Sequence, residues 1–251
     1  GWVAGTVHKV PWEAKPRVDS FDKDRWELYN VGEDFSQSND LAAKNPEKLK
    51  ELQALFLKEA EKFQVLPLDD RLLERFIASM VGRPDLMEGR NSMTLHEGMT
   101  GMMDNVFINV KNRSHTITAE LEIPKAGTEG VIICQGGRFG GWSLYTKDGK
   151  LNYCYNWVGL EQYKMTADKS LAAGKVTVKF EFVYDGGGLG KGGKGTLFVN
   201  GEKVAEGRIE HTASVIFSPD ETADVGVDEA TNVTEDYKER DNKFTGKIKK
   251  V

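Results

Sequence analysis

The chain has 251 residues, of which 39% are hydrophobic and 29% are charged, and its formal net charge is −5. This length is enough for one large domain or two smaller ones, and the hydrophobic content is enough for a packed core. The acidic balance excludes the broad basic surface that a nucleic-acid backbone requires. No apolar run reaches the ~18 residues that would predict a membrane span.

Residues 1–70 have a mixed composition with one amphipathic segment. Short strands are expected at residues 2–7 and 26–31. A helix is expected to begin at Pro46 with Asn45 as its N-cap, because apolar side chains then recur at steps of three and four: Leu49, Leu52, Phe56, Ala60 and Phe63. Two strands under one helix are marginal alone, so this region is expected to cover part of a larger body.

Residues 71–103 are expected to form a connecting segment that packs on the next domain. The apolar residues at its start could form a short helix, and several glycines and Pro84 then interrupt any regular pattern. The apolar residues are Leu72, Leu73, Phe76, Ile77 and Met80.

From residue 104 to residue 251 the hydrophobic period changes to two. Apolar residues alternate with polar ones over residues 117–123 and 176–184, and Asp148-Gly149 and Asn200-Gly201 are typical of tight hairpin turns. These signals predict a mainly β fold, an antiparallel jelly-roll-like β-sandwich. The turns predict the cross-strand pairs Trp142 with Tyr155, Leu144 with Tyr153, and Leu197 with Val204.

Several motifs that could carry chemistry have simpler interpretations. The run from Gly188 to Gly193 has the G-x-G-x-x-G pattern, but strands are expected on both sides of it, whereas a phosphate site needs a following helix. It is interpreted as a loop. The four histidines lack metal-ligand spacing and are expected on the surface or on strand faces. Cys134 and Cys154 are expected to be buried free thiols, with a disulfide as the alternative.

Two further groups of residues leave alternatives open. The most acidic stretch is interpreted as a solvated loop, with Ca²⁺ binding as the alternative; it contains Asp220, Glu221, Asp224, Asp228, Glu229, Glu235 and Asp236. Aromatic residues gather around the hairpin of residues 142–163, where core packing explains most of them. If this hairpin binds carbohydrate, Trp157 and Tyr163 are the expected ligand-binding residues.

The first region resembles the C-terminal subdomain of type I sulfatases, as found in bacterial arylsulfatases. The resemblance rests on an aromatic strand, acidic residues after it and the start of a helix: Trp26-Glu27-Leu28-Tyr29-Asn30, Glu33-Asp34, Asn39-Asp40-Leu41 and Pro46-Glu47-Lys48-Leu49. Residues 136–142, 184–193 and 244–248 resemble the β-rich region appended to longer bacterial arylsulfatases. At fold level that region is similar to a concanavalin A/laminin-G-type sandwich.

The resemblance implies three regions. Residues 1–70 would be a small α+β remnant of the sulfatase C-terminal subdomain, residues 71–103 a connecting segment and residues 104–251 the β-sandwich. Sulfatases of this family use a formylglycine made within C-x-P-x-R or S-x-P-x-R. The closest stretch here begins at Cys134 and ends at Arg138, and Gly136 stands where proline is needed. No catalytic residue and no metal ligand are therefore expected in this chain, and it is expected to be inactive alone.

The chain is thus interpreted as a non-catalytic C-terminal fragment of an arylsulfatase that supports the catalytic domain and the substrate entrance. That N-terminal domain is the implied partner and the expected holder of Ca²⁺, and the implied location is periplasmic or secreted. Because the sequence opens without a signal-peptide pattern, an internal start is expected. A lectin-like module that binds polysaccharide is the alternative, and an independent hydrolase is a weaker one. Exposed apolar surface in residues 1–70 could also produce a homo-oligomer.

Overall fold

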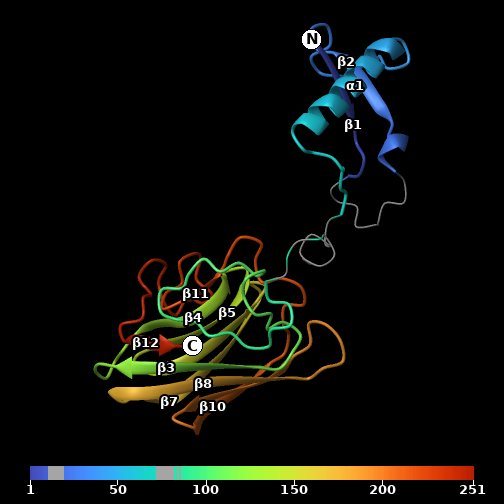
Figure 1. The fold of residues 1–251 in the computed structure, drawn as a ribbon. Helices are drawn as coiled ribbons and strands as arrows, with labels where there is room; N and C mark the ends of the chain where they lie inside the picture. Colours follow the sequence, from blue (N-terminus) through green and yellow to red (C-terminus); the bar gives the residue numbers. More distant parts are fainter. Residues whose placement is uncertain (11–19, 72–81, 83, 85) are drawn as a thin grey trace. The chain divides into compact units, whose positions relative to one another are not determined.

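A computed structural model of the protein describes residues 1–10, 20–71, 82, 84 and 86–251. The chain forms two compact units, Gly1–Arg75 and Phe76–Val251 (Figure 1). The short helix expected from Leu72 to Met80 lies outside the described residues. No helix in the described parts of the chain is long and apolar enough to cross a membrane.

Unit 1 contains the two strands and the helix that its sequence predicts. Strands β1 (Trp2–Thr6) and β2 (Trp26–Asn30) pair antiparallel, a 3₁₀ turn η1 (Phe21–Lys23) precedes β2, and helix α1 spans Pro46–Lys62. Leu28 and Ala60 are its buried hydrophobic side chains among the described residues. A unit of this size with so little buried apolar surface has a minimal core.

Side-chain hydrogen bonds fix the turn between β2 and α1. Asp40 Oδ1 accepts hydrogen bonds from the backbone N–H groups of Leu28 (3.0 Å) and Ala42 (2.9 Å). Asn45 occupies the N-cap position, but its side chain does not cap α1. Its amide instead donates to the carbonyl oxygen of Leu41 at 3.4 Å. The predicted N-cap position is therefore correct, but the capping hydrogen bond is absent.

Unit 2 consists of two five-stranded antiparallel sheets, which confirms the predicted mainly β sandwich. The β8 sheet has the order β10-β9-β8-β3-β12, and the β5 sheet has the order β11-β4-β5-β6-β7 (Figure 1). The strands of the β8 sheet are β3 (His115–Ile123), β8 (Gly174–Tyr184), β9 (Gly193–Val199), β10 (Glu202–Ile209) and β12 (Lys247–Lys250). Those of the β5 sheet are β4 (Gly130–Gly137), β5 (Gly140–Lys147), β6 (Lys150–Trp157), β7 (Glu161–Ser170) and β11 (Ala223–Val225).

The inner faces of the two sheets share one hydrophobic core. Alternate residues of β3 and β8 are buried, as their period of two predicts. Tyr153 of the β5 sheet stacks on Phe180 of the β8 sheet, with ring centroids 3.5 Å apart. The predicted pairs Trp142 with Tyr155 and Leu144 with Tyr153 are present.

Hairpin geometry follows the turn residues in one case and departs from prediction in the other. Asp148 and Gly149 both adopt positive φ angles of 52° and 70°, as this two-residue turn requires. After the second turn, the register shifts between Lys203 and Ala205, so Leu197 pairs with Ala205. The predicted pair of Leu197 with Val204 is therefore wrong, because a bulge inserts one extra residue there.

Strands β4, β5 and β6 of the β5 sheet are buried on both faces. Residues 226–246, called the covering segment below, lie over its outer face and bring Val233 and Tyr237 against Tyr145 and both cysteines. Asp236 anchors the covering segment by accepting a hydrogen bond from Tyr145 Oη at 2.5 Å and by forming an ion pair with Lys147. Cys134 and Cys154 are buried free thiols; they lie on either side of β5, each paired with Ser143.

Candidate functional site

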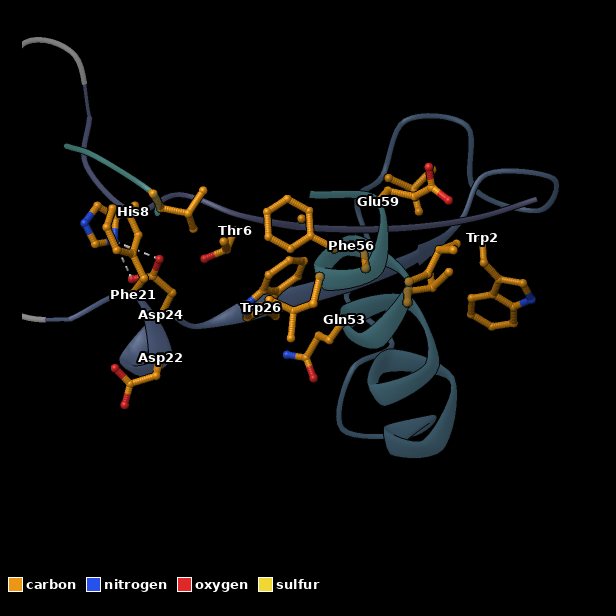
Figure 2. Close-up of a pocket in the computed structure, with 17 residues that line it drawn as sticks. Trp2, Thr6, His8, Phe21, Asp22, Asp24, Trp26, Gln53, Phe56 and Glu59 are labelled. Atoms are coloured by element: carbon orange, nitrogen blue, oxygen red, sulfur yellow. Dashed lines mark hydrogen bonds and ion pairs between the residues drawn. The ribbon is translucent and has the colours of Figure 1, made fainter. Parts of the chain in front are cut away.

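An apolar hollow of about 940 Å³ lies between the strands and the helix of unit 1. Figure 2 shows Trp26 and Phe56 near its middle, and their rings meet edge to face with centroids 5.7 Å apart. Val3 and Phe56 remain 40% and 38% exposed. The hollow is thus a mostly apolar surface that water reaches, of the kind that packs against another body.

One end of this hollow carries a charged group. His8 Nδ1 lies 2.8 Å from Asp24 Oδ2, and the imidazole stacks on Phe21 with centroids 3.7 Å apart (Figure 2). His8 Nε2 lies 3.4 Å from Asp70 Oδ2. This pairing holds the chain segment before β2 against the segment after β1, which is a structural task.

A second, more polar groove of about 500 Å³ lies at one end of the β5 sheet in unit 2. Three segments form it: the β4–β5 turn, the β6–β7 turn and the covering segment. The residues that line it are Arg138, Phe139, Asn156, Val158, Gly159, Leu160, Gln162, Asn232, Thr234 and Glu235.

A single buried amide ties the three walls of this groove together. The two N–H groups of Asn156 Nδ2 are shared among the carbonyl oxygens of Gly137 (3.2 Å), Arg138 (2.9 Å) and Val233 (3.0 Å). Its Oδ1 accepts the N–H of Gly159 at 2.9 Å. Because one side chain satisfies backbone groups of all three segments, the groove is fixed before any ligand binds.

The β6–β7 turn contains a β-branched residue with a positive φ. Val158 has a φ of 46°, a region that β-branched residues rarely occupy. Strained residues of this kind are found at ligand sites more often than elsewhere. The hydrogen bond from Gly159 to Asn156 holds the turn in this conformation and presents Leu160 at the rim.

The rim and the floor of the groove offer different chemistry. Phe139 and Leu160 are 71% and 74% exposed, so the rim is apolar. Arg138 carries a guanidinium whose Nη2 lies 3.7 Å from Glu239 Oε1. On the floor, Asn232 Oδ1 is buried without a hydrogen-bond partner. The arrangement suits a ligand with one apolar face and several hydroxyl groups.

The lining residues favour binding over hydrolysis. They include one carboxylate, Glu235, whereas glycoside hydrolysis uses a pair of carboxylates across the scissile bond. They include no serine, cysteine or histidine that could act as a nucleophile with its base. The interpretation of this chain as an independent hydrolase therefore has no support from this groove.

Trp157 and Tyr163, the residues expected from the sequence, are half-buried and pack against the core between the sheets. The ring of Trp157 lies 4.6 Å from that of His211, and Tyr163 Oη donates to Glu161. Burial and this carboxylate raise the pKa of Tyr163 to about 12. Neither residue lines the groove, and their role in ligand binding stays a prediction.

Sequence reasoning missed Arg138 and Phe139. It treated Arg138 as the end of an imperfect sulfatase motif, and both residues as part of the stretch 136–142 that resembles the arylsulfatase appendage. The signal that could have found them is an apolar residue in a turn between two glycines, Gly137 and Gly140.

The acidic stretch is only partly the solvated loop expected from the sequence, since Asp220, Glu229 and Glu235 are exposed but two of its aspartates are not. Asp224 and Asp228 are 2% and 1% exposed. Strand β11 pairs with β4 and sets Asp224 opposite Cys134, beneath the covering segment. Burial raises the pKa of Asp228 to about 6, against the hydrogen bond from Tyr237. Burial and the nearby carboxylates also raise the pKa of the Cys134 thiol.

The two packed antiparallel sheets and the groove at their end define unit 2 as a β-sandwich module. Solved structures with a similar sandwich include domains LG4-5 of the mouse laminin α1 chain (15% identity, TM-score 0.39), which covers 63% of this chain and 36% of that one. Another is the CBM40 module of a Ruminococcus gnavus intramolecular trans-sialidase bound to α2,3-sialyllactose (14% identity, TM-score 0.43), covering 63% and 89%. A third is a pentraxin from Limulus polyphemus (16% identity, TM-score 0.36), covering 62% and 71%.

These similarities are weak, and the assignment of unit 2 as a β-sandwich rests on its own two sheets. The similar structures are laminin-G, CBM40 and pentraxin-type β-sandwich modules. They give no support to the resemblance to sulfatases. No protein-family model matches the sequence, and no curated protein matches it.

Proposed function

We propose that unit 2 is a carbohydrate-binding module and that its ligand binds in the groove beside Phe139. The observation that carries this proposal is the exposed phenyl ring at the rim of a polar groove whose walls are tied together by Asn156. The outer face of the β5 sheet is closed by the covering segment. A site at the ends of the strands is therefore more accessible than a site on the face of that sheet.

A sugar ring has the two kinds of surface that this groove offers. Its C–H face packs on an aromatic ring, and Phe139 presents such a ring to solvent. Its hydroxyl groups both donate and accept hydrogen bonds, and Arg138, Thr234 and Glu235 line the groove with donors and acceptors. The guanidinium of Arg138 would also favour a carboxylated or sulfated sugar, because it can donate two parallel hydrogen bonds to such a group.

Calorimetric titration of the full chain tests the proposal, with cellohexaose, an alginate oligosaccharide and a carrageenan oligosaccharide as neutral, carboxylated and sulfated probes. We expect binding of at least one probe, and about tenfold weaker binding in Phe139→Ala, a loss of ~1.4 kcal/mol. Phe35→Ala is the matched control, since Phe35 is 91% exposed in unit 1.

Trp157→Ala separates this groove from the site expected from the sequence. If Phe139→Ala binds as the unchanged chain does and Trp157→Ala does not, the ligand binds elsewhere on the hairpin and the groove proposal is wrong. If no probe binds at millimolar concentration, the carbohydrate proposal itself is wrong.

We also infer a second role, for unit 1, from its apolar hollow. The residues that resemble the sulfatase C-terminal subdomain form β2, the turn fixed by Asp40, and the start of α1. Next to them lies the hollow that contains Trp26 and Phe56. On this inference the chain is a non-catalytic C-terminal part of an arylsulfatase, and unit 1 packs on the catalytic domain while unit 2 lies at the substrate entrance.

Reconstitution tests this second role. A type I arylsulfatase catalytic domain truncated before its C-terminal subdomain is mixed with this chain, and turnover of 4-nitrophenyl sulfate is measured with added Ca²⁺. We expect no turnover by this chain alone and a gain when the two are mixed, which Phe56→Asp abolishes. A hollow that is covered instead by a second copy would appear as a dimer in light scattering that Phe56→Asp dissociates, and that result would contradict the inference.

A further inference from the structure

Three donor atoms converge under the covering segment of unit 2. One carboxylate oxygen each from Asp224 and Asp228 and the Sγ of Cys134 lie within 4.8 Å of one another. All three residues are buried, with exposed fractions of 2%, 1% and 0%. Asp224 and Cys134 are cross-strand partners in β11 and β4, so the sheet itself sets two of the three positions.

The hydrogen bonds of the two aspartates leave one oxygen without a partner. Asp224 accepts the N–H of Gly101 at 2.8 Å and the hydroxyl of Thr222 at 3.1 Å through Oδ1, and the N–H of Glu229 at 3.4 Å through Oδ2. Asp228 Oδ2 accepts the hydroxyl of Tyr237 at 2.8 Å and the N–H of Val233 at 3.2 Å. Asp228 Oδ1 is buried and accepts no hydrogen bond. A carboxylate oxygen in that state is destabilised unless a proton or a cation compensates it.

A third carboxylate lies close by and is in the same condition. Glu221 Oε1 accepts the hydroxyl of Thr231, but Oε2 is buried without a partner. A Cβ on Gly137 would lie 2.2 Å from that oxygen, so the carboxylate packs directly on the backbone of β4. Among the residues that the structure describes, none of the ion pairs formed by Lys, Arg or His involves Glu221, Asp224 or Asp228.

We propose that Asp224 and Asp228 bind a divalent cation through their carboxylate oxygens. The donor set decides its class. Two carboxylates, with that of Glu221 nearby, are hard oxygen ligands that suit Ca²⁺. The thiol of Cys134 points its proton at the carbonyl oxygen of Val227 at 3.6 Å, which makes it a neighbour of the ion and not a ligand.

The site would connect the β5 sheet to the covering segment that follows β11. Asp224 belongs to the β5 sheet, whereas Asp228 holds Val233 and Tyr237 of the covering segment. A cation between them would fasten that segment to the sheet. This proposal is independent of the carbohydrate proposal, because its test measures only the ion and the folded state.

The first experiment is calorimetric titration of the chelator-treated full chain with CaCl₂. We expect one Ca²⁺ per chain and a higher unfolding temperature of unit 2 with Ca²⁺, since an ion that binds only the folded state stabilises it by mass action. Asp228→Asn should weaken Ca²⁺ binding at least tenfold. The amide oxygen can still accept the bonds of Tyr237 and Val233, so without Ca²⁺ this variant should unfold at no lower temperature than the unchanged chain.

Two variants control for less specific explanations. Glu229→Gln removes an exposed carboxylate from the same stretch and should leave Ca²⁺ affinity unchanged. Cys134→Ser should also leave it unchanged. Absence of Ca²⁺ binding, or equal weakening by Glu229→Gln and Asp228→Asn, would overturn the proposal. So would binding of Zn²⁺ alone that Cys134→Ser abolishes, because the ion would then require the thiol.

Terbium luminescence gives a second readout that does not depend on any one variant folding. Tb³⁺ replaces Ca²⁺ at oxygen sites and emits when a nearby tyrosine is excited, and Tyr237 Oη lies 2.8 Å from Asp228 Oδ2. We expect Tb³⁺ emission from the unchanged chain, loss of that emission when Ca²⁺ displaces Tb³⁺, and little emission from Asp224→Asn. Emission that Ca²⁺ does not displace would count against the site.

Discussion

Units 1 and 2 differ in the size of their hydrophobic cores. In unit 1, the helix α1 buries Ala60 and leaves Phe56 38% exposed, although its apolar residues follow the pattern of a buried face. In unit 2, one core runs between two sheets and a smaller one lies under the covering segment. The difference teaches that an amphipathic pattern shows where a partner surface belongs, and does not show that the chain itself provides that surface.

The largest expected effect is on the core of unit 2. Trp142 is 1% exposed, and its Nε1 donates to Gln135 Oε1 at 3.2 Å. We expect Trp142→Ala to lower the free energy of unfolding of unit 2 by about 3–5 kcal/mol, as measured in urea. A loss below ~1 kcal/mol would mean that the two units do not differ in the way described above.

Two titratable groups of unit 2 with opposite effects, His115 and Asp228, are expected to contribute to the pH dependence of stability. Burial lowers the pKa of His115 from 6.5 to about 4 in the folded state. As the pH falls from 6.5 to 4, the unfolded chain therefore binds a proton that the folded chain does not, and stability decreases over that window. The expected contribution of His115 between pH 7 and pH 4.5 is a loss of about 2 kcal/mol. The raised pKa of Asp228 opposes this loss, because the folded chain binds that proton first as the pH falls.

His115→Phe measures this contribution directly. The variant keeps a ring next to Phe180 and Phe182 and cannot bind the proton. Its stability should therefore fall less than that of the unchanged chain over the same pH range, in unfolding curves recorded at each pH. Parallel pH profiles for the two proteins would show that His115 is not the responsible group.

Removal of divalent cations should have a smaller effect than these changes in stability, and the quantity affected is the affinity for glycan. Arg138 N–H donates to Thr231 Oγ1 at 2.9 Å, and Thr231 in turn donates to Glu221, so two hydrogen bonds connect the groove to the carboxylate next to the proposed cation site. We expect EDTA to weaken glycan binding about three-fold, ~0.7 kcal/mol, in calorimetric titration. The same loss in Asp228→Asn without EDTA is the matching control.

The smallest expected effect on folding stability is in unit 1. Because Phe56 is already 38% exposed, Phe56→Ala should lower the stability of unit 1 by about 1 kcal/mol or less. Hydrogen exchange of the α1 amides gives the measurement. A loss as large as that expected for Trp142→Ala would show that the hollow is filled in solution, and it would remove the contrast between the units.

The strands of the sandwich could be predicted because their signals are local. The alternation from Ile117 to Ile123 is visible without knowing the partner strand, and the Asp148-Gly149 turn sets its own register. The bulge after Lys203 could not be predicted, since nothing in residues 202–209 distinguishes the paired residue from the extra one.

The covering segment and the burial of Asp224 and Asp228 could not be predicted for a different reason. β11 has three residues, too few for a period, and its pairing with β4 joins residues about ninety positions apart. Val233 and Tyr237 are isolated apolar residues in an acidic stretch. The groove was missed because it needs that same long-range contact to supply its third wall.

The arrangement of the sheets also has a consequence for synthesis. β11 forms one edge of the β5 sheet, and β12 forms one edge of the β8 sheet. Neither sheet is therefore complete until residues 223–250 have been added. While a ribosome is still translating that stretch, the nascent sandwich has two unprotected edges and an uncovered outer face. Folding of unit 2 is therefore expected to finish only once this stretch has left the exit tunnel, and chaperones that hold nascent strands would act in that interval.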